Sequence, residues 1–150
     1  MTLMRLKNRK TILKFKSNED LSEIDMLNIL ERIISSYKKR MSDLSNAVTI
    51  EMGAPKSLAE KAQVPSGLGH FMQAKRILEN FSFEKEVNFS IVQKEPIGVC
   101  GLITPWNWPI NQITLKVLPA IATGCASILK PSEHTPISAV VYTCLLYTSP

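Results

Sequence analysis

The spacing of apolar residues along the chain changes near Glu86. Before that point apolar residues recur three or four positions apart, which is the period of an amphipathic helix. Ser22 followed by Asp25 is typical of a capping box at a helix start, and Gly53 is expected to stop a second helix. Pro65 is expected to bend or restart a third helix. The pattern predicts helices over about 22–40, 43–51 and 57–80.

Directly after Glu86 the apolar residues recur at every second position, which is typical of a strand. Val87, Phe89 and Ile91 alternate with polar residues, which predicts a half-buried strand. From Gly98 onward, short apolar runs alternate with helical patterns. The predicted order is strand 99–103, loop 104–108, helix 109–123, strand 126–129, loop 130–135 and a helix from 136. This alternation builds a parallel sheet with a right-handed crossover, so the predicted fold class is α/β, with a helical layer formed by the N-terminal half.

Three residues predict details of the helices in this second half. Gly124 is expected to follow the end of the middle helix, because glycine readily adopts the left-handed conformation found there. Pro119 lies inside that helix and is expected to kink it. Thr135 before Pro136 is typical of an N-cap followed by the first helical residue.

The composition is that of a soluble globular domain, with 45% hydrophobic residues and a net charge of +5. No apolar run approaches the roughly 20 residues that a membrane-spanning helix needs, so no membrane partner is expected. The excess positive charge lies before the first acid, Glu19, and the remaining charges nearly balance. We expect no nucleic-acid partner, although a basic arm of this kind is also found in targeting peptides and phosphate-binding tails.

The cysteines and histidines show no spacing typical of a metal site or a disulfide framework. Cys100, Cys125 and Cys144 are odd in number and include no C-x-x-C pair, which is typical of a reducing cytoplasm. Each is expected to behave as a small apolar residue. His70 and His134 have no ligand partners at a useful spacing, and no metal is predicted.

Asn107 is the first candidate for chemistry. It lies between Trp106 and Trp108 in a turn that prolines flank on both sides, so its amide is expected to be held rigidly. An amide held in this way stabilises a developing negative charge on oxygen. Asparagine is also a favoured N-cap, and Asn107 stands just before the helix predicted to begin at Pro109. The local sequence leaves both interpretations open.

Lys130 and Glu133 are the second candidates. The loops after two parallel strands emerge at the same edge of the sheet, where open α/β sheets bind ligands, so both residues are expected to face a crevice. An ammonium group and a carboxylate together recognise the two hydroxyls of a ribose, and the carboxylate would repel a 2′-phosphate, which favours NAD over NADP. A surface ion pair beside a helix start is the alternative. Gly98-x-x-Gly101 is not the dinucleotide fingerprint G-x-G-x-x-G.

Four segments, taken together, resemble the NAD(P)-dependent aldehyde dehydrogenases. They are Glu95-Pro96-Ile97-Gly98-Val99-Cys100-Gly101, Ile103-Thr104-Pro105-Trp106-Asn107-Trp108-Pro109, Pro119-Ala120-Ile121-Ala122-Thr123-Gly124 and Lys130-Pro131-Ser132-Glu133-x-Thr135-Pro136. The segment 51–55 also resembles the family, and the similarity spans roughly Phe15 to Ala139. The resemblance implies a Rossmann-like cofactor-binding domain and the oxidation of an aldehyde to a carboxylate. A cysteine nucleophile forms a thiohemiacetal, hydride passes to the nicotinamide, and the thioester is hydrolysed.

The resemblance also implies roles for individual residues. The amide of Asn107 matches the donor to the oxyanion. The cofactor contacts are implied at Ile103, Thr104, Pro105, Trp106, Lys130, Ser132 and Glu133. The implied cofactor is NAD, with NADP second, the substrate is an aldehyde, and the enzyme is implied to be a homo-oligomer in the cytoplasm.

The family's nucleophile, general base and phosphate-binding turn are not matched within these residues. We therefore expect a fragment without dehydrogenase activity, with 1–143 as part of the cofactor-binding domain. Residues 144–150 read like a translated sequencing adapter and are expected to be a non-native tail, with no continuation of the family's helix after Ala139. Two alternatives stay open: an acylating or phosphate-reducing relative on the same fold, and a stand-alone nucleotide-binding or interaction module that uses the helical layer and basic arm.

Overall fold

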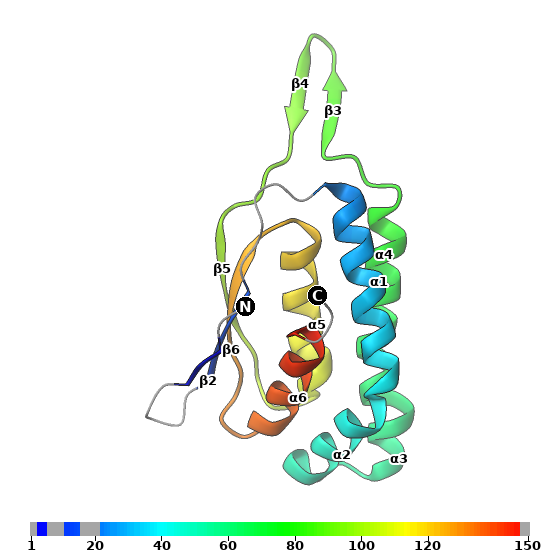
Figure 1. Cartoon of the computed structure of the whole chain (residues 1–150), viewed down its shortest axis with the longest axis vertical. Helices are drawn as coiled ribbons and strands as arrows, with labels where there is room; N and C mark the ends of the chain where they lie inside the picture. Colours follow the sequence, from blue (N-terminus) through cyan, green and yellow to red (C-terminus); the bar gives the residue numbers. More distant parts are fainter. Residues whose placement is uncertain (1–2, 6–10, 16–21, 148–150) are drawn as a thin grey trace.

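The computed structural model describes residues 3–5, 11–15 and 22–147 of the chain. A sheet lies on one side, α5 and α6 lie beside it, and α1 and α4 lie beyond them, with a hairpin projecting from one end (Figure 1). The elements in order are β1 (Leu3–Arg5), β2 (Thr11–Phe15), α1 (Glu23–Lys39), α2 (Met41–Met52), α3 (Lys56–Leu58), the π-helical turn η1 (Ala59–Gln63), α4 (Val64–Leu78), β3 (Glu84–Val87), β4 (Ser90–Gln93), β5 (Val99–Ile103), α5 (Pro109–Ala122), β6 (Ala126–Lys130) and α6 (Pro136–Tyr147).

The starts and ends of the first helices follow the local sequence signals. The Ser22 hydroxyl accepts a hydrogen bond from the Asp25 backbone N–H at 3.2 Å, and the Asp25 carboxylate accepts one from the Ser22 N–H at 3.0 Å. This is a complete capping box at the start of α1, as predicted. Gly53 ends α2 with a left-handed φ of 67°, also as predicted.

The irregularity predicted near Pro65 is a π-helical turn. The Val64 N–H bonds to the Ala59 carbonyl across η1, and α4 then begins with Pro65 in its first turn. Proline has no N–H to donate along the helix, and π-helical turns of this kind accommodate such an interruption. The chain therefore passes Pro65 in a continuous helical path from α3 to α4.

The sheet is mixed, with strand order β1-β2-β6-β5. β5 and β6 are parallel and α5 crosses between them, which confirms the predicted α/β unit. β2 pairs antiparallel with β6, and β1 pairs antiparallel with β2. The sheet is therefore not wholly parallel, because the N-terminal residues add two antiparallel strands that apolar spacing alone did not predict.

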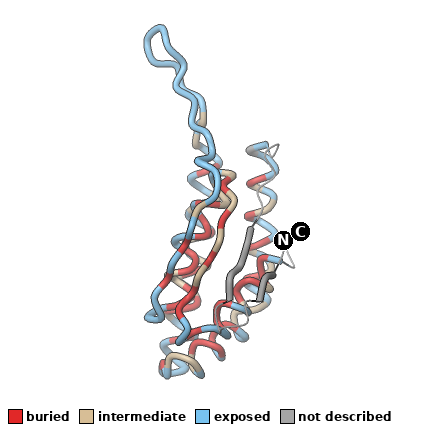
Figure 2. Tube along the Cα trace, turned by 90° about the vertical axis from the view of Figure 1, so that its left-hand side faces the viewer, coloured by how far each residue is buried: buried red, intermediate tan, exposed pale blue. Residues whose placement is uncertain are grey.

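The prediction of a half-buried strand around Phe89 is wrong. Residues 84–93 form the antiparallel hairpin β3–β4, and every residue in both strands is exposed (Figure 2). Phe89 stands in its turn with a fully exposed side chain. Alternation of polar and apolar residues occurs in any two-stranded ribbon, and here the described residues supply no layer for the apolar positions to pack on.

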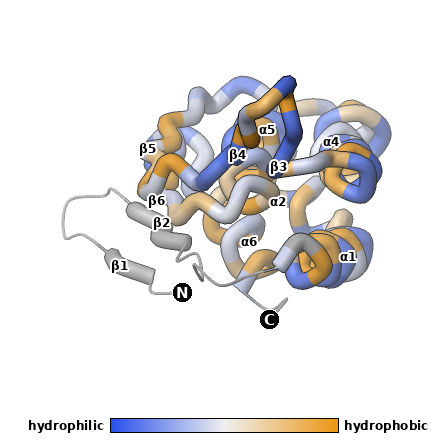
Figure 3. Tube along the Cα trace, turned by 90° about the horizontal axis from the view of Figure 1, so that it is seen from above, coloured by the Kyte–Doolittle hydropathy of each residue, from blue (hydrophilic) through white to orange (hydrophobic). Residues whose placement is uncertain are grey.

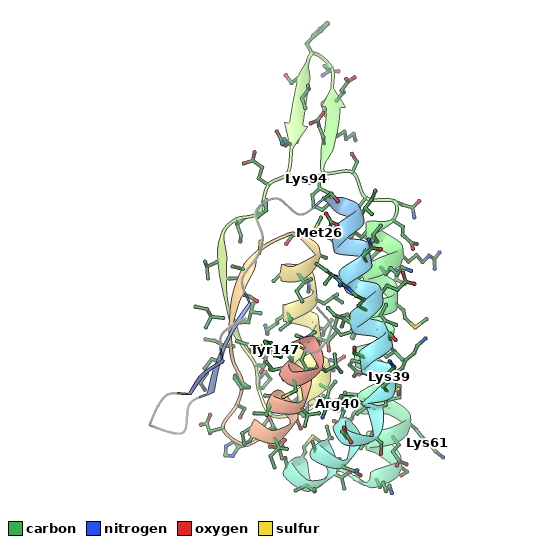
Figure 4. The ribbon with its side chains drawn as sticks, viewed as in Figure 1. Met26, Lys39, Arg40, Lys61, Lys94 and Tyr147 are labelled. Carbon is green, nitrogen blue, oxygen red and sulfur yellow. The ribbon has the colours of Figure 1, made fainter. Side chains whose placement is uncertain are left out.

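The base of the hairpin is braced by aromatic residues and a lysine. The rings of Phe81 and Phe83 meet edge to face with centroids 5.0 Å apart, and the Lys94 ammonium lies 4.3 Å from the Phe81 centroid. The Lys94 N–H also bonds to the Phe83 carbonyl at 2.7 Å. Figure 4 shows Lys94 where the hairpin joins the body. A lone two-stranded hairpin is marginally stable in water, so these contacts help to stabilise the base of this one.

The core lies between the helices and one face of the sheet. Tyr37, Phe71 and Tyr142 form a buried aromatic cluster with ring centroids 5.9 to 6.4 Å apart. Apolar positions on the helices gather toward one another when the molecule is seen from above (Figure 3). The opposite face of the sheet is open among the described residues, and Val99 and Ile103 are about two-thirds exposed there.

Within the α5 region, Pro119 lies inside the helix as predicted, and Gly124 follows its end with a left-handed φ of 72°. No helix of the described residues is long and apolar enough to cross a membrane.

Candidate functional site

The two candidate loops leave the sheet side by side. Ile103, at the end of β5, pairs with Lys130, at the end of β6. One residue further on, the Thr104 N–H bonds to the Lys130 carbonyl at 3.3 Å. The loops that carry Asn107 and Glu133 therefore begin at one edge of the sheet, as the parallel arrangement predicted.

The loop from Thr104 to Trp108 presents Asn107 to solvent. Thr104 is buried and anchors the loop, whereas Pro105, Trp106 and Asn107 are exposed. Asn107 does not cap α5, because Trp108 occupies the N-cap position and the helix has no side-chain cap. Helix capping, one of the two interpretations of Asn107 that the sequence left open, is therefore wrong.

Trp108 has a left-handed backbone, with φ 55° and ψ 54°. A bulky residue rarely adopts this conformation, which costs on the order of 1–3 kcal/mol and is concentrated at functional sites. The strained residue directly follows Asn107 and so helps to set the direction of its backbone.

The indoles of this loop are only partly packed. Trp106 is 50% exposed and Trp108 is 37% exposed. Trp106 instead meets the ring of His134 edge to face, with centroids 6.4 Å apart. His134 was not a candidate from the sequence, because its contact partner lies 28 positions away, yet it joins the two loops.

Lys130 and Glu133 form an ion pair, with 3.4 Å between Nζ and Oε2. The Glu133 backbone N–H and the Lys130 ammonium group hold the pKa of the Glu133 carboxyl below its usual value. The two side chains are 40% and 66% exposed, and the crevice that they are expected to face stays a prediction. The pair has the form of the surface ion pair that was the alternative interpretation, at the sheet edge where a ligand would bind.

The short loop between β6 and α6 is held by its own backbone. The buried Ser132 hydroxyl accepts a hydrogen bond from the His134 N–H at 3.2 Å, and the Ser132 carbonyl accepts one from the Thr135 N–H at 3.3 Å. Ser132 thus shapes the loop that carries Glu133.

Glu51 anchors this loop from a distant part of the chain. Its carboxylate accepts hydrogen bonds from the Ile137 N–H, from the Ser138 N–H at 2.7 Å and from the Ser138 hydroxyl at 2.6 Å. These N–H groups are the ones that an N-cap side chain at Thr135 would bond to, so Glu51 takes the capping role predicted for Thr135. No local pattern could show this, because Glu51 lies on α2, far away in sequence.

Comparison with known proteins identifies the fold. A model of the aldehyde dehydrogenase family matches residues 10–148. The chain belongs to the aldehyde dehydrogenase family. The match extends beyond the segment 15–139 implied by the sequence motifs, and α6 runs on to Tyr147, so the expected loss of the helix after Ala139 is wrong. Leu145 is fully buried in this helix. The foreign origin of residues 144–150 stays a prediction.

Relatives that match this aldehyde dehydrogenase chain are several times longer. It is 49% identical over 119 residues to a 3-succinoylsemialdehyde-pyridine dehydrogenase from a Pseudomonas species, covering 79% of this chain and 25% of the relative. It matches aldehyde dehydrogenase C from Pseudomonas syringae, solved as a mutant with NAD+ and octanal, with a TM-score of 0.86 and 40% identity over 88% of this chain and 27% of that one. The chain thus spans about a quarter of its relatives' length.

A third match concerns the cofactor. The glyceraldehyde-3-phosphate dehydrogenase GapN from Methanocaldococcus jannaschii, solved with NADP, gives a TM-score of 0.78 and 25% identity over 87% of this chain and 29% of that one. Structural neighbours of the aldehyde dehydrogenase chain thus include one solved with NAD and one solved with NADP. Among the described residues, no group of three or more histidines, cysteines or acids is placed to hold a metal ion.

Proposed function

We propose that this chain is the part of an aldehyde dehydrogenase that supplies the oxyanion donor and the ribose contacts, in an enzyme that oxidises an aldehyde to a carboxylate with NAD. The observation that carries the proposal is the parallel pairing of Ile103 with Lys130, which brings the Asn107 loop and the Glu133 loop to one sheet edge. Ligands bind at this edge in open α/β sheets.

Asn107 is proposed as the donor to the substrate oxygen. Its amide nitrogen carries two N–H donors, its side chain is exposed, and it does not cap α5. A donor set at the oxygen that gains charge stabilises the transition state more than the substrate. The strained backbone of Trp108, next in sequence, supports this role because it fixes the loop at a cost that a simple connection would not require.

Lys130 and Glu133 are proposed to hold the adenine ribose. The ammonium group donates hydrogen bonds and the carboxylate accepts them, and the two hydroxyls of a vicinal diol need one partner of each kind. When bound, NAD supplies the hydride acceptor. The negative charge of the Glu133 carboxylate would repel a 2′-phosphate, which supports NAD over NADP. Ile103, Pro105 and Trp106 are proposed to line the cofactor site, with buried Thr104 and Ser132 shaping its two loops.

We propose that the 150 residues alone have no dehydrogenase activity. The family resemblance matches none of the three cysteines to the nucleophile: Cys100 lies in β5, Cys125 precedes β6 and Cys144 lies in α6. These free thiols support a reducing compartment such as the cytoplasm.

The parent enzyme is proposed to be a homo-oligomer. The projecting hairpin exposes Val87, Phe89, Ile91 and Val92, all at least 43% accessible. An apolar ribbon of this kind with no cover among the described residues is typical of a surface that another subunit covers.

The proposal is tested by restoring the missing part of the enzyme. The segment of the Pseudomonas 3-succinoylsemialdehyde-pyridine dehydrogenase that matches this chain is replaced by the chain's own residues. We expect the chimera to reduce NAD when it is given an aldehyde, and we expect the isolated chain to show no such activity. Turnover by the isolated chain would overturn its predicted inactivity. A folded chimera that binds no NAD would overturn the assignment of the ribose contacts.

A further inference from the structure

Cys100 and Cys125 lie together although 25 positions separate them. Cys100 is in β5 opposite Ser127 of β6, and Cys125 directly precedes β6. Along β5, Cys100 and Leu102 alternate with the exposed Val99, Gly101 and Ile103, so Cys100 lies on the covered side of the sheet. Cys125 is itself buried. Cys125 stands two positions before Ser127, so the register places the two free thiols near each other on adjacent segments of the chain.

The surroundings of the two thiols differ. Burial raises the pKa of Cys125, but hydrogen bonds from the Thr123 hydroxyl, the Ile97 and Gly98 backbone and the Cys100 thiol outweigh it and lower that pKa below its usual value. The Thr123 Oγ1 lies 3.4 Å from the Cys125 Sγ. Burial and the neighbouring Cys125 raise the pKa of Cys100. Of the two thiols, Cys125 is therefore the one that loses its proton more readily.

We propose that Cys100 and Cys125 form a redox-active thiol pair that closes to a disulfide when a hydroperoxide oxidises Cys125. The Cys125 thiolate attacks the terminal oxygen of the peroxide, the O–O bond breaks, and the peroxide is reduced to an alcohol, or to water in the case of hydrogen peroxide. The sulfur of Cys125 is oxidised to a sulfenic acid. The Cys100 sulfur then attacks the Cys125 sulfur, the S–O bond breaks, and hydroxide leaves and takes up the Cys100 proton as water.

The pair is placed where a cross-link would join two segments that lead to the loops of the site. Cys100 lies in β5, which leads into the Thr104–Trp108 loop. Cys125 lies between α5 and β6, and β6 leads into the loop that carries Glu133. Cys100 is partly exposed and Cys125 is buried, so we expect a small peroxide to approach the pair from the side of Cys100. The modification is independent of the proposed function, because neither cysteine is assigned to catalysis or cofactor binding.

The test uses the folded chain with Cys144→Ser, so that only the pair remains. After treatment with a small excess of hydrogen peroxide, we expect the intact mass to fall by two hydrogen atoms. Peptide mapping should show a Cys100–Cys125 cross-link, and dithiothreitol should reverse it. In the same background, Cys100→Ser should instead leave Cys125 as a sulfenic acid that dimedone traps, with no loss of mass. Thr123→Val should slow the reaction because it removes a hydrogen bond to the thiolate.

Two results would overturn the proposal. One is oxidation of Cys125 to the sulfinic acid while Cys100 stays a free thiol. The other is a rate of cross-linking in concentrated urea equal to that of the folded chain, since the fold would then not be what brings the two thiols together. Mapping of the unmodified chain by alkylation after peroxide treatment gives the same answer without any substitution, so the test does not depend on the variants folding.

Discussion

At the scale of single residues, the structure places strain and close contact where the sequence shows only common residue types. Trp108 stands in a left-handed conformation beside Asn107, and Gly67 on α4 lies directly against the Tyr37 hydroxyl. The sequence could single out Asn107, because two prolines and two tryptophans surround it. It could not show that Gly67 is required, because that need arises from a contact with α1, 30 positions away.

Gly67→Ala is expected to destabilise the protein although alanine is the better helix former. A Cβ at Gly67 would collide with the Tyr37 hydroxyl and lie 3.0 Å from Ile110 Cγ2, in a packed core. Overpacking of this kind costs about 1–3 kcal/mol of the free energy of unfolding. Gly69→Ala is the matched control, since its Cβ meets nothing within 4 Å, and it should stabilise α4 by about 1 kcal/mol. Urea unfolding measures both, and equal effects of the two substitutions would contradict the account.

At the scale of elements, helix boundaries followed from local signals, whereas partners across the chain did not. The capping box of α1 and the glycine that ends α2 were predicted because their hydrogen bonds and backbone angles are local. Burial of the hairpin was predicted wrongly, because alternation fixes which residues share a face but not whether another layer covers that face. The cap of α6 was missed because its acceptor, Glu51, comes from α2.

Glu51→Ala is expected to loosen α6 and the loop before it. The carboxylate bonds to two backbone N–H groups and one hydroxyl at the start of the helix, so its loss should cost about 1–2 kcal/mol of stability. Glu60→Ala serves as control, because Glu60 makes only an exposed ion pair with Lys56 at 3.8 Å and should change stability by less than about 1 kcal/mol. Hydrogen exchange of residues 134–138 should quicken in Glu51→Ala alone. Unchanged exchange there would rule out the long-range cap.

The capping box should weaken in acid. Hydrogen bonds from the Ser22 hydroxyl and N–H keep the pKa of Asp25 below its usual value of 3.8. Because the folded pKa is the lower one, its contribution to stability is complete above the unfolded pKa and is lost as pH falls through the folded pKa. The stability difference between wild type and Asp25→Asn should therefore be constant near neutral pH and shrink in strong acid. A difference that stays constant down to the lowest accessible pH would refute this linkage.

At the scale of the whole molecule, the described residues leave apolar side chains open on the hairpin and on the outer face of β5. The α/β class and the adjacent loops could be predicted because strand and helix periods alternate. The antiparallel strands β1 and β2 could not, because they lie in the basic N-terminal stretch whose apolar pattern is short. A chain that spans a quarter of its relatives' length is expected to leave such surfaces uncovered.

Phe89→Ser is expected to weaken self-association of the chain without changing its stability. Phe89 is fully exposed at the hairpin turn, so within one copy its ring contributes little to folding. Sedimentation at several concentrations should show a smaller species for Phe89→Ser than for wild type. Lys85→Ser, on the same hairpin, should leave the sedimentation unchanged. A wild-type chain that is monomeric at every concentration would contradict the proposed oligomer surface.

The central claim, that Asn107 is the oxyanion donor, is tested most directly by the turnover number of the chimera described above. Asn107→Ala should lower kcat about 10²–10³-fold while the affinity for NAD is unchanged, because the amide acts on the substrate oxygen and not on the cofactor. Asn80→Ala is the control. Asn80 lies just after α4, and its side chain donates a hydrogen bond to the Arg76 carbonyl at 3.2 Å, so the kcat of this variant should equal that of the unmodified chimera. An Asn107→Ala chimera with undiminished kcat would contradict the account.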